Sequence, residues 1–107
     1  MLVYEVNIEI DSSRREEFLG WIDGHVSGVL SSNNFFRAHF FNERSFESMS
    51  EESSKFVVQY CANRMEDIEH YLKNFAPKLR EDAINKFGDS LRINRRLLQS
   101  IDKNPAS

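Results

Sequence analysis

Strict alternation of apolar and polar side chains is the first pattern in the chain. Over residues 2–10, the apolar positions that share one face are Leu2, Tyr4, Val6, Ile8 and Ile10. A repeat of two residues predicts a β-strand with one face in a core. The same alternation recurs over residues 35–41, 55–62 and 90–98. The chain is therefore expected to form four strands.

Apolar residues at helical spacing fill the segments between these strands. Residues 13–30 form an amphipathic pattern, and a second helical region follows the third strand. Ser13 and Asn63, each with a glutamate three residues later, are the predicted N-terminal caps. Pro77 divides the second region into two helices because proline suits only a first helical turn. Gly88 is the predicted left-handed stop.

The order of elements is strand, helix, strand, strand, helix, strand, which is the ferredoxin-like α+β arrangement. Right-handed crossovers place both helical regions on one side of a four-stranded antiparallel sheet, with the first and third strands central. Residues 43–54 are rich in serine and glutamate and predict an exposed loop between the middle strands. We expect a single domain over residues 1–101 and a frayed tail over residues 102–107.

One face of this sheet has no helix to cover it. We call it the open face. Its expected apolar side chains are Val3, Phe35, Phe41, Val57 and Cys61, whereas Phe36 and Phe40 are expected to face the helices. An exposed apolar patch usually marks an interface. The simplest cover is a second copy of the chain, sheet against sheet, which predicts a homodimer. A monomer with one wet sheet face is the alternative.

The polar residues of the open face are the candidate site. If two open faces meet, a ligand pocket would be lined by Glu5, Asn7, Arg37, His39, Gln59 and Arg92. His39 is the candidate acid–base residue among them, on weak grounds because it stands alone. The alternative is structural: Arg92 and Arg96 would pair across strands with Glu9 and Glu5.

Three other residues stand out. Trp21 and His25 lie one helical turn apart beside the apolar stripe. His25 is either a general base or a side chain that packs at the helix flank, and packing is the simpler interpretation. Arg95 interrupts the apolar row of the last strand, so it is expected to point inward and to have a carboxylate partner.

Composition narrows the classes of function. The 107 residues carry 14 basic and 17 acidic side chains, and the net charge of −3 argues against general nucleic-acid binding. No run approaches the ~20 apolar residues of a membrane span, and no signal peptide is apparent, so a cytoplasmic protein is expected. One cysteine excludes an internal disulfide, and the three histidines lack metal-ligand spacing. We therefore expect neither a metal nor another cofactor.

Several short motifs together resemble a known family. They are YEVN at residues 4–7, WIDGHV at 21–26, VQY at 58–60, a segment with AP-x-LR and a final Phe-Gly at 71–88, and INRRLL at 93–98. They resemble a small bacterial family known as a domain of unknown function, which looks like a member of the dimeric α/β-barrel superfamily. The resemblance implies a ferredoxin-like fold and a dimer. It implies no single activity, because that superfamily includes cofactor-independent monooxygenases, isomerases, haem enzymes and ligand-sensing domains.

Two functional hypotheses follow. The first is a homodimeric module without an assigned reaction that binds a small ligand or a protein partner at its sheet face. The second is a small cofactor-independent enzyme of the monooxygenase or isomerase kind, with His39 as the acid–base group and Arg37 or Arg92 holding an anion. RNA binding is disfavoured because Tyr4 and Tyr60 are expected on the covered face of the central strands.

Overall fold

The alternating and helical segments of the sequence form the elements that their periods predict. A computed structural model describes residues 1–101 of the chain. Its elements are β1 (Leu2–Ile10), η1 (Ser12–Arg14), α1 (Arg15–Leu30), β2 (Arg37–Asn42), β3 (Lys55–Ala62), α2 (Met65–Asn74), α3 (Ala76–Phe87), η2 (Gly88–Ser90) and β4 (Leu91–Gln99). The predicted tail at residues 102–107 lies outside the described residues.

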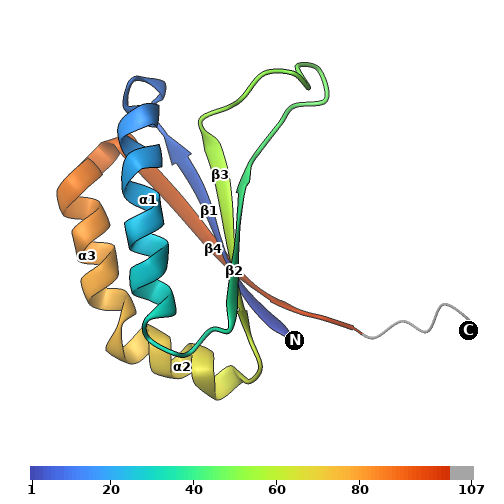
Figure 1. Cartoon of the computed structure of the whole chain (residues 1–107), viewed down its shortest axis with the longest axis vertical. Helices are drawn as coiled ribbons and strands as arrows, with labels where there is room; N and C mark the ends of the chain where they lie inside the picture. Colours follow the sequence, from blue (N-terminus) through green and yellow to red (C-terminus); the bar gives the residue numbers. More distant parts are fainter. Residues whose placement is uncertain (102–107) are drawn as a thin grey trace, which may run out of the picture.

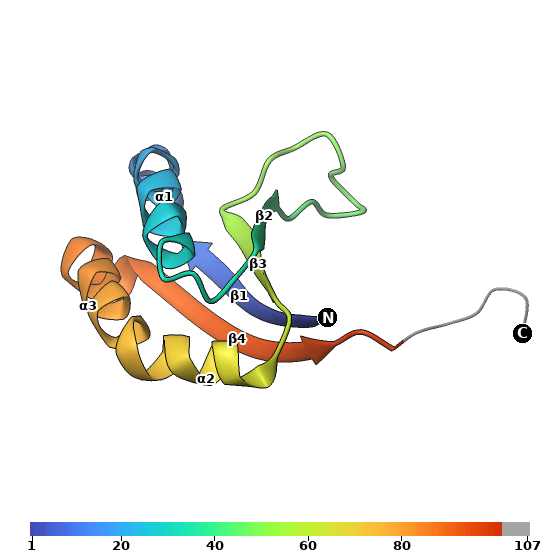
Figure 2. The ribbon, with the colours of Figure 1, turned by 60° about the horizontal axis from the view of Figure 1, so that its bottom comes forward.

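The four strands form one antiparallel sheet in the order β2-β3-β1-β4. This order confirms the ferredoxin-like α+β prediction, with β1 and β3 in the centre. Figures 1 and 2 show α1 and α3 packed over one face of the sheet, with α2 at one end of that layer. The opposite face carries no helix.

The core fills the space between the helices and the sheet. Its largest fully buried side chains are Phe18, Phe56, Ile10, Val29 and Val58. Each comes from an apolar row that the periodicity defines, and burying one such side chain contributes roughly 1.5–3 kcal/mol. These contacts fix the helical layer on the sheet.

Both predicted N-terminal caps are wrong. Ser13 lies inside η1, and α1 begins at Arg15 without a side-chain cap. Residue Arg64, not Asn63, precedes α2, and its guanidinium donates to Asp67 instead of capping the backbone. The stop at Gly88 is confirmed, because α3 ends there at a φ of 53° that an L side chain adopts poorly.

The start of the second strand also departs from the prediction. β2 begins only at Arg37, so the alternation does not extend to the two preceding phenylalanines. Phe35 is 6% exposed and lies in the core with its ring 5.0 Å from that of Tyr71, whereas Phe36 is 53% exposed. The chain bends into the core before the strand starts, which reverses the expected roles of these residues. The open face therefore lacks Phe35.

The segment between β2 and β3 is an exposed loop, as predicted. It contains no helix or strand, and Phe46 at its tip is 92% exposed. Its base is held by Asn42, whose amide donates to the carbonyl oxygen of Ser53 at 2.9 Å. Arg15 of α1 donates to the same carbonyl oxygen at 3.0 Å.

Candidate functional site

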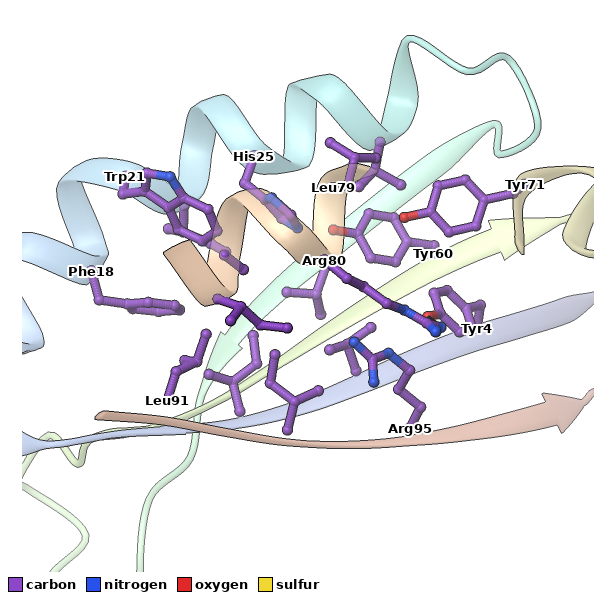
Figure 3. A pocket seen from close by; sticks show the side chains of 18 of the residues that line it. Tyr4, Phe18, Trp21, His25, Tyr60, Tyr71, Leu79, Arg80, Leu91 and Arg95 are labelled. Atoms are coloured by element: carbon purple, nitrogen blue, oxygen red, sulfur yellow. Dashed lines mark hydrogen bonds between the residues drawn. The ribbon is translucent and has the colours of Figure 1, made fainter. Parts of the chain in front are cut away.

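A cavity of about 240 Å³ lies between the helices and the sheet. Its floor is formed by β1, β3 and β4 and its roof by α1 and α3, as Figure 3 shows. The exposed lining residues are Arg80, Ile84, Gly88 and Arg95, so the mouth lies between β4 and α3 with the turn that follows α3. The cavity is thus internal to one chain and opens at one edge of the sheet.

Short apolar side chains leave this space open. Val6, Val58 and Ile93 project from the floor, and Ala83 is the lining residue of α3 directly above them in the core. Because the side chain of Ala83 is only a methyl group, it leaves space between α3 and the sheet that a larger side chain would fill. The result is an apolar chamber with aromatic rings at its two ends, Phe18 and Trp21 at one and Tyr4 and Tyr71 at the other.

His25 enters the cavity from α1. Its ring stacks on that of Trp21 with centroids 4.5 Å apart. Burial lowers the pKa of His25 and the nearby charge of Arg95 lowers it further, against an opposing effect of Asp82. The imidazole is therefore neutral at pH 7 and can accept a proton from a bound ligand.

Tyrosine hydroxyls supply further polar groups. Burial raises the pKa of Tyr71 to about 12 and raises that of Tyr60 even more. Both hydroxyls therefore stay protonated at physiological pH and can donate hydrogen bonds. The hydroxyl of Tyr4 accepts a hydrogen bond from the Arg80 guanidinium at 3.1 Å.

Arg95 points into the cavity, as predicted, but the expected carboxylate partner is wrong. It lines the cavity beside Arg80, and within residues 1–101 it forms no ion pair. Its charge acts on both His25 and Tyr71. The Arg95 guanidinium thus faces the cavity instead of an acidic side chain.

On the open face, three of the sequence-predicted residues form one network. Glu5, only 2% exposed, accepts hydrogen bonds from Gln59 at 3.0 Å and Asn7 at 3.1 Å. Arg96 also donates to this carboxylate. The Arg96 hydrogen bond is the main reason that the pKa of Glu5 falls to about 2. The network matches the structural alternative, in which these side chains satisfy one another.

The other predicted residues lie around that network. Arg92 forms ion pairs with Glu9 and Asp11, each at 3.0 Å. His39 and Arg37 are exposed on the edge strand β2, and His39 lies opposite Gln59 in the strand register. Neither donates to the Glu5 carboxylate. A ligand site on the open face stays a prediction, and it would use His39 and Arg37 from the edge.

Sequence reasoning did not gather the cavity residues into one site. Tyr4, Tyr60 and Tyr71 look like ordinary core residues in their apolar rows, and His25 was assigned more simply to packing. The one signal was Arg95, a charge in a row that should be apolar. No group of three or more His, Cys, Asp or Glu side chains in residues 1–101 could hold a metal ion. No helix in that range is long and apolar enough to span a membrane.

Comparisons with known proteins agree with this architecture. A family model described as "Domain of unknown function (DUF4286)" matches residues 1–101. No curated protein matches the sequence significantly.

Several solved structures share the fold. SnoaB of Streptomyces nogalater, a cofactor-independent oxygenase, aligns in its N63A form with a TM-score of 0.68 and 13% identity over 97% of each chain. A Deinococcus radiodurans protein assigned as an antibiotic biosynthesis monooxygenase aligns with a TM-score of 0.72 and 6% identity, over 97% of this chain and 96% of its own. An EthD-family protein of Bacillus halodurans aligns with a TM-score of 0.67 and 12% identity, over 94% of this chain and 100% of its own.

Proposed function

Because the chain belongs to the family described as Domain of unknown function (DUF4286), we propose its function from the geometry of the cavity: the protein binds a small aromatic compound between its helices and its sheet. The observation that carries this proposal is an apolar chamber of about 240 Å³ that also holds an imidazole and tyrosine hydroxyls. Ligand sites combine these features, with apolar walls for affinity and a few polar groups for orientation.

The size of the chamber limits the ligand. A dry protein cavity of about 150 Å³ can hold one benzene ring. The present cavity of about 240 Å³ therefore suits a compound of one or two rings. This location differs from the open face, whose polar side chains already satisfy one another around Glu5.

The single tryptophan gives a direct binding assay, since Trp21 lies in the cavity wall. We expect 1-naphthol to quench Trp21 fluorescence in a saturable manner. Ala83→Leu fills the chamber and should weaken binding at least tenfold. Ala38→Leu is the matched control, because Ala38 is half-buried on β2 and does not line the cavity. Equal affinity in both variants would contradict a ligand site in this chamber.

A second candidate is a cofactor-independent oxygenase, and His25 is the observation that favours it. A neutral imidazole in the cavity can take the hydroxyl proton of a bound phenol, which leaves an electron-rich anion. With 1-naphthol and O₂, carbon 4 of the anion would bond to one oxygen atom. Loss of the C4 hydrogen and cleavage of the O–O bond would then give 1,4-naphthoquinone and one water. SnoaB, which shares the fold, is an oxygenase of this kind.

Oxygen consumption tests the reaction separately from binding. We expect the wild type to consume O₂ with 1-naphthol and His25→Gln to lose at least 100-fold in rate while it still quenches on binding. The matched control is His39→Gln, which changes the only other histidine that the sequence offers as an acid–base group. A rate that falls with His39→Gln and not with His25→Gln would move the chemistry to the open face.

We also infer a homodimer formed through the open faces. Phe41 is 47% exposed there, and Val3 and Val57 flank the buried Glu5 network. The loss of Phe35 from this face makes the apolar area smaller than the sequence suggested, yet the patch still spans three strands. Val57→Arg should give a monomer in sedimentation equilibrium, while Leu72→Arg on α2 should not. A monomeric wild type would refute the inference. A cytoplasmic location remains a prediction from the sequence.

A further inference from the structure

Two arginines stand at one end of the cavity. Arg80 comes from α3 and Arg95 from β4, and both line the chamber. Figure 3 shows the Arg80 guanidinium directed toward Tyr4 and the Arg95 side chain rising from β4 into the space below Arg80. Both charges also lower the pKa of Tyr71, against the larger effect of burial, which raises it.

These cations differ from most arginines in the described chain. Ion pairs within residues 1–101 involve Arg14, Arg15, Arg44, Arg64, Arg92 and Arg96. Neither Arg80 nor Arg95 has a carboxylate partner there, and Arg80 instead donates to the neutral hydroxyl of Tyr4. Two guanidinium groups at the mouth of one apolar chamber can both donate hydrogen bonds to a single bound anion.

The strand register places the Arg95 charge in an otherwise apolar row, at the exposed mouth of the cavity. β4 directs Leu91, Ile93 and Arg95 toward the helices, and Arg95 pairs in register with the apolar Val6. A leucine at this position would continue the row and bury apolar surface. A residue that breaks its own row without a partner indicates a role outside stability.

We propose that Arg80 and Arg95 together bind the carboxylate of an aromatic acid whose ring system occupies the cavity. The planar guanidinium fork matches a carboxylate in two parallel hydrogen bonds, which favours this anion on an apolar body. In that pose the rings extend past His25 toward Trp21 and Phe18, along the direction seen in Figure 3. The inference rests on the proposed cavity site and names its ligand class.

Two matched probes distinguish the cavity site itself from the binding of a carboxylate by its two arginines. 1-Naphthoic acid and 1-naphthamide share one ring system and differ in charge, and both are titrated against Trp21 fluorescence at pH 7. We expect the acid to bind about 10- to 100-fold more tightly than the amide, the range of a charge-assisted hydrogen-bond pair. Arg95→Leu and Arg80→Met should each remove most of this difference, because each weakens binding of the acid far more than binding of the amide. Arg64→Met, an exposed arginine on the approach to α2, is the control and should change neither affinity.

Each outcome is decisive. Equal binding of acid and amide by the wild type would overturn the arginine assignment and leave the cavity site standing. No saturable binding of either probe would overturn both. Arg95→Leu completes the apolar row, so the melting temperature of this variant should equal or exceed that of the wild type. This measurement shows that a loss of binding is not caused by unfolding. A preference for the acid that survives Arg80→Met together with Arg95→Leu would place the anion elsewhere.

Discussion

The buried Glu5 carboxylate should make the stability of the protein depend on acid in a defined way. Glu5 accepts hydrogen bonds from Arg96, Gln59 and Asn7, and its pKa falls from 4.5 to about 2. A folded-state pKa below the unfolded value means that the folded state favours the charged form. The stabilisation is therefore complete above about pH 4.5 and is lost as the pH falls toward 2.

The magnitude follows from the size of that change. Each pKa unit corresponds to about 1.4 kcal/mol, so the full effect of a fall from 4.5 to about 2 would be about 3.5 kcal/mol. The Arg96 side chain is 64% exposed, and solvent screens its charge, which reduces the expected contribution of Glu5 to about 2 kcal/mol. Glu5→Gln removes the charge at nearly constant volume. We expect it to lower the unfolding free energy by about 2 kcal/mol at pH 7.

Urea unfolding followed by Trp21 fluorescence measures the unfolding free energy of the wild type and of Glu5→Gln between pH 7 and pH 2.5. The difference between wild type and Glu5→Gln should shrink steadily below pH 4.5, because protonation removes the advantage of the wild type. Glu9→Gln is the matched control on the same strand and face, where the carboxylate is 45% exposed and pairs with Arg92. It should have a much smaller effect. A difference between wild type and Glu5→Gln that stays constant with pH would refute the reasoning.

Three further predictions test the fold and the cavity. Phe35→Ala should cost roughly 3–5 kcal/mol in urea unfolding, whereas Phe36→Ala should stay within about 0.5 kcal/mol, because only the first ring is buried; equal costs would restore the alternation predicted from sequence. Gly88→Ala should lower stability by about 1–2 kcal/mol, since φ is 53° there, and an unchanged melting temperature would contradict that backbone. Protonation of His25 should quench Trp21 fluorescence with a midpoint below pH 6.5, because burial lowers the pKa of His25. A midpoint at or above pH 6.5 would place the imidazole in solvent. A midpoint retained in His25→Gln would assign the quenching to another group.

The fold was predictable because each strand carries its own period. The four alternating segments, the split at Pro77 and the stop at Gly88 are local features, and their order limits the topology to few choices. The errors lie where local pattern competes with a bend. Phe35 and Phe36 both fit an alternating strand, and only the tertiary path shows that the strand begins at Arg37. The predicted cap at Ser13 failed for a similar reason, since a capping pattern does not reveal an additional 3₁₀ turn such as η1.

The cavity was harder to predict than the fold because its walls come from seven elements. Spacing within one segment places Trp21 next to His25, yet it cannot show that Tyr71 and Arg80 lie across the same space. Arg95 was the exception, because its charge conflicts with the row around it. The sequence attributed that conflict to an ion pair with a protein carboxylate, whereas the structure places Arg95 in the lining of the cavity.

The two faces of the sheet differ in how their charged side chains are paired, and this difference supports the proposed cavity site. On the open face, Glu5 is surrounded by donors that hold it ionised, so the network has little capacity left for a ligand. On the covered face, Arg95 has no carboxylate partner within the described residues, and His25 is kept neutral by burial. A cation without a carboxylate partner beside a neutral imidazole is the basis of our proposal that an acidic aromatic ligand binds in the cavity. The open face is then free to serve the interface between chains.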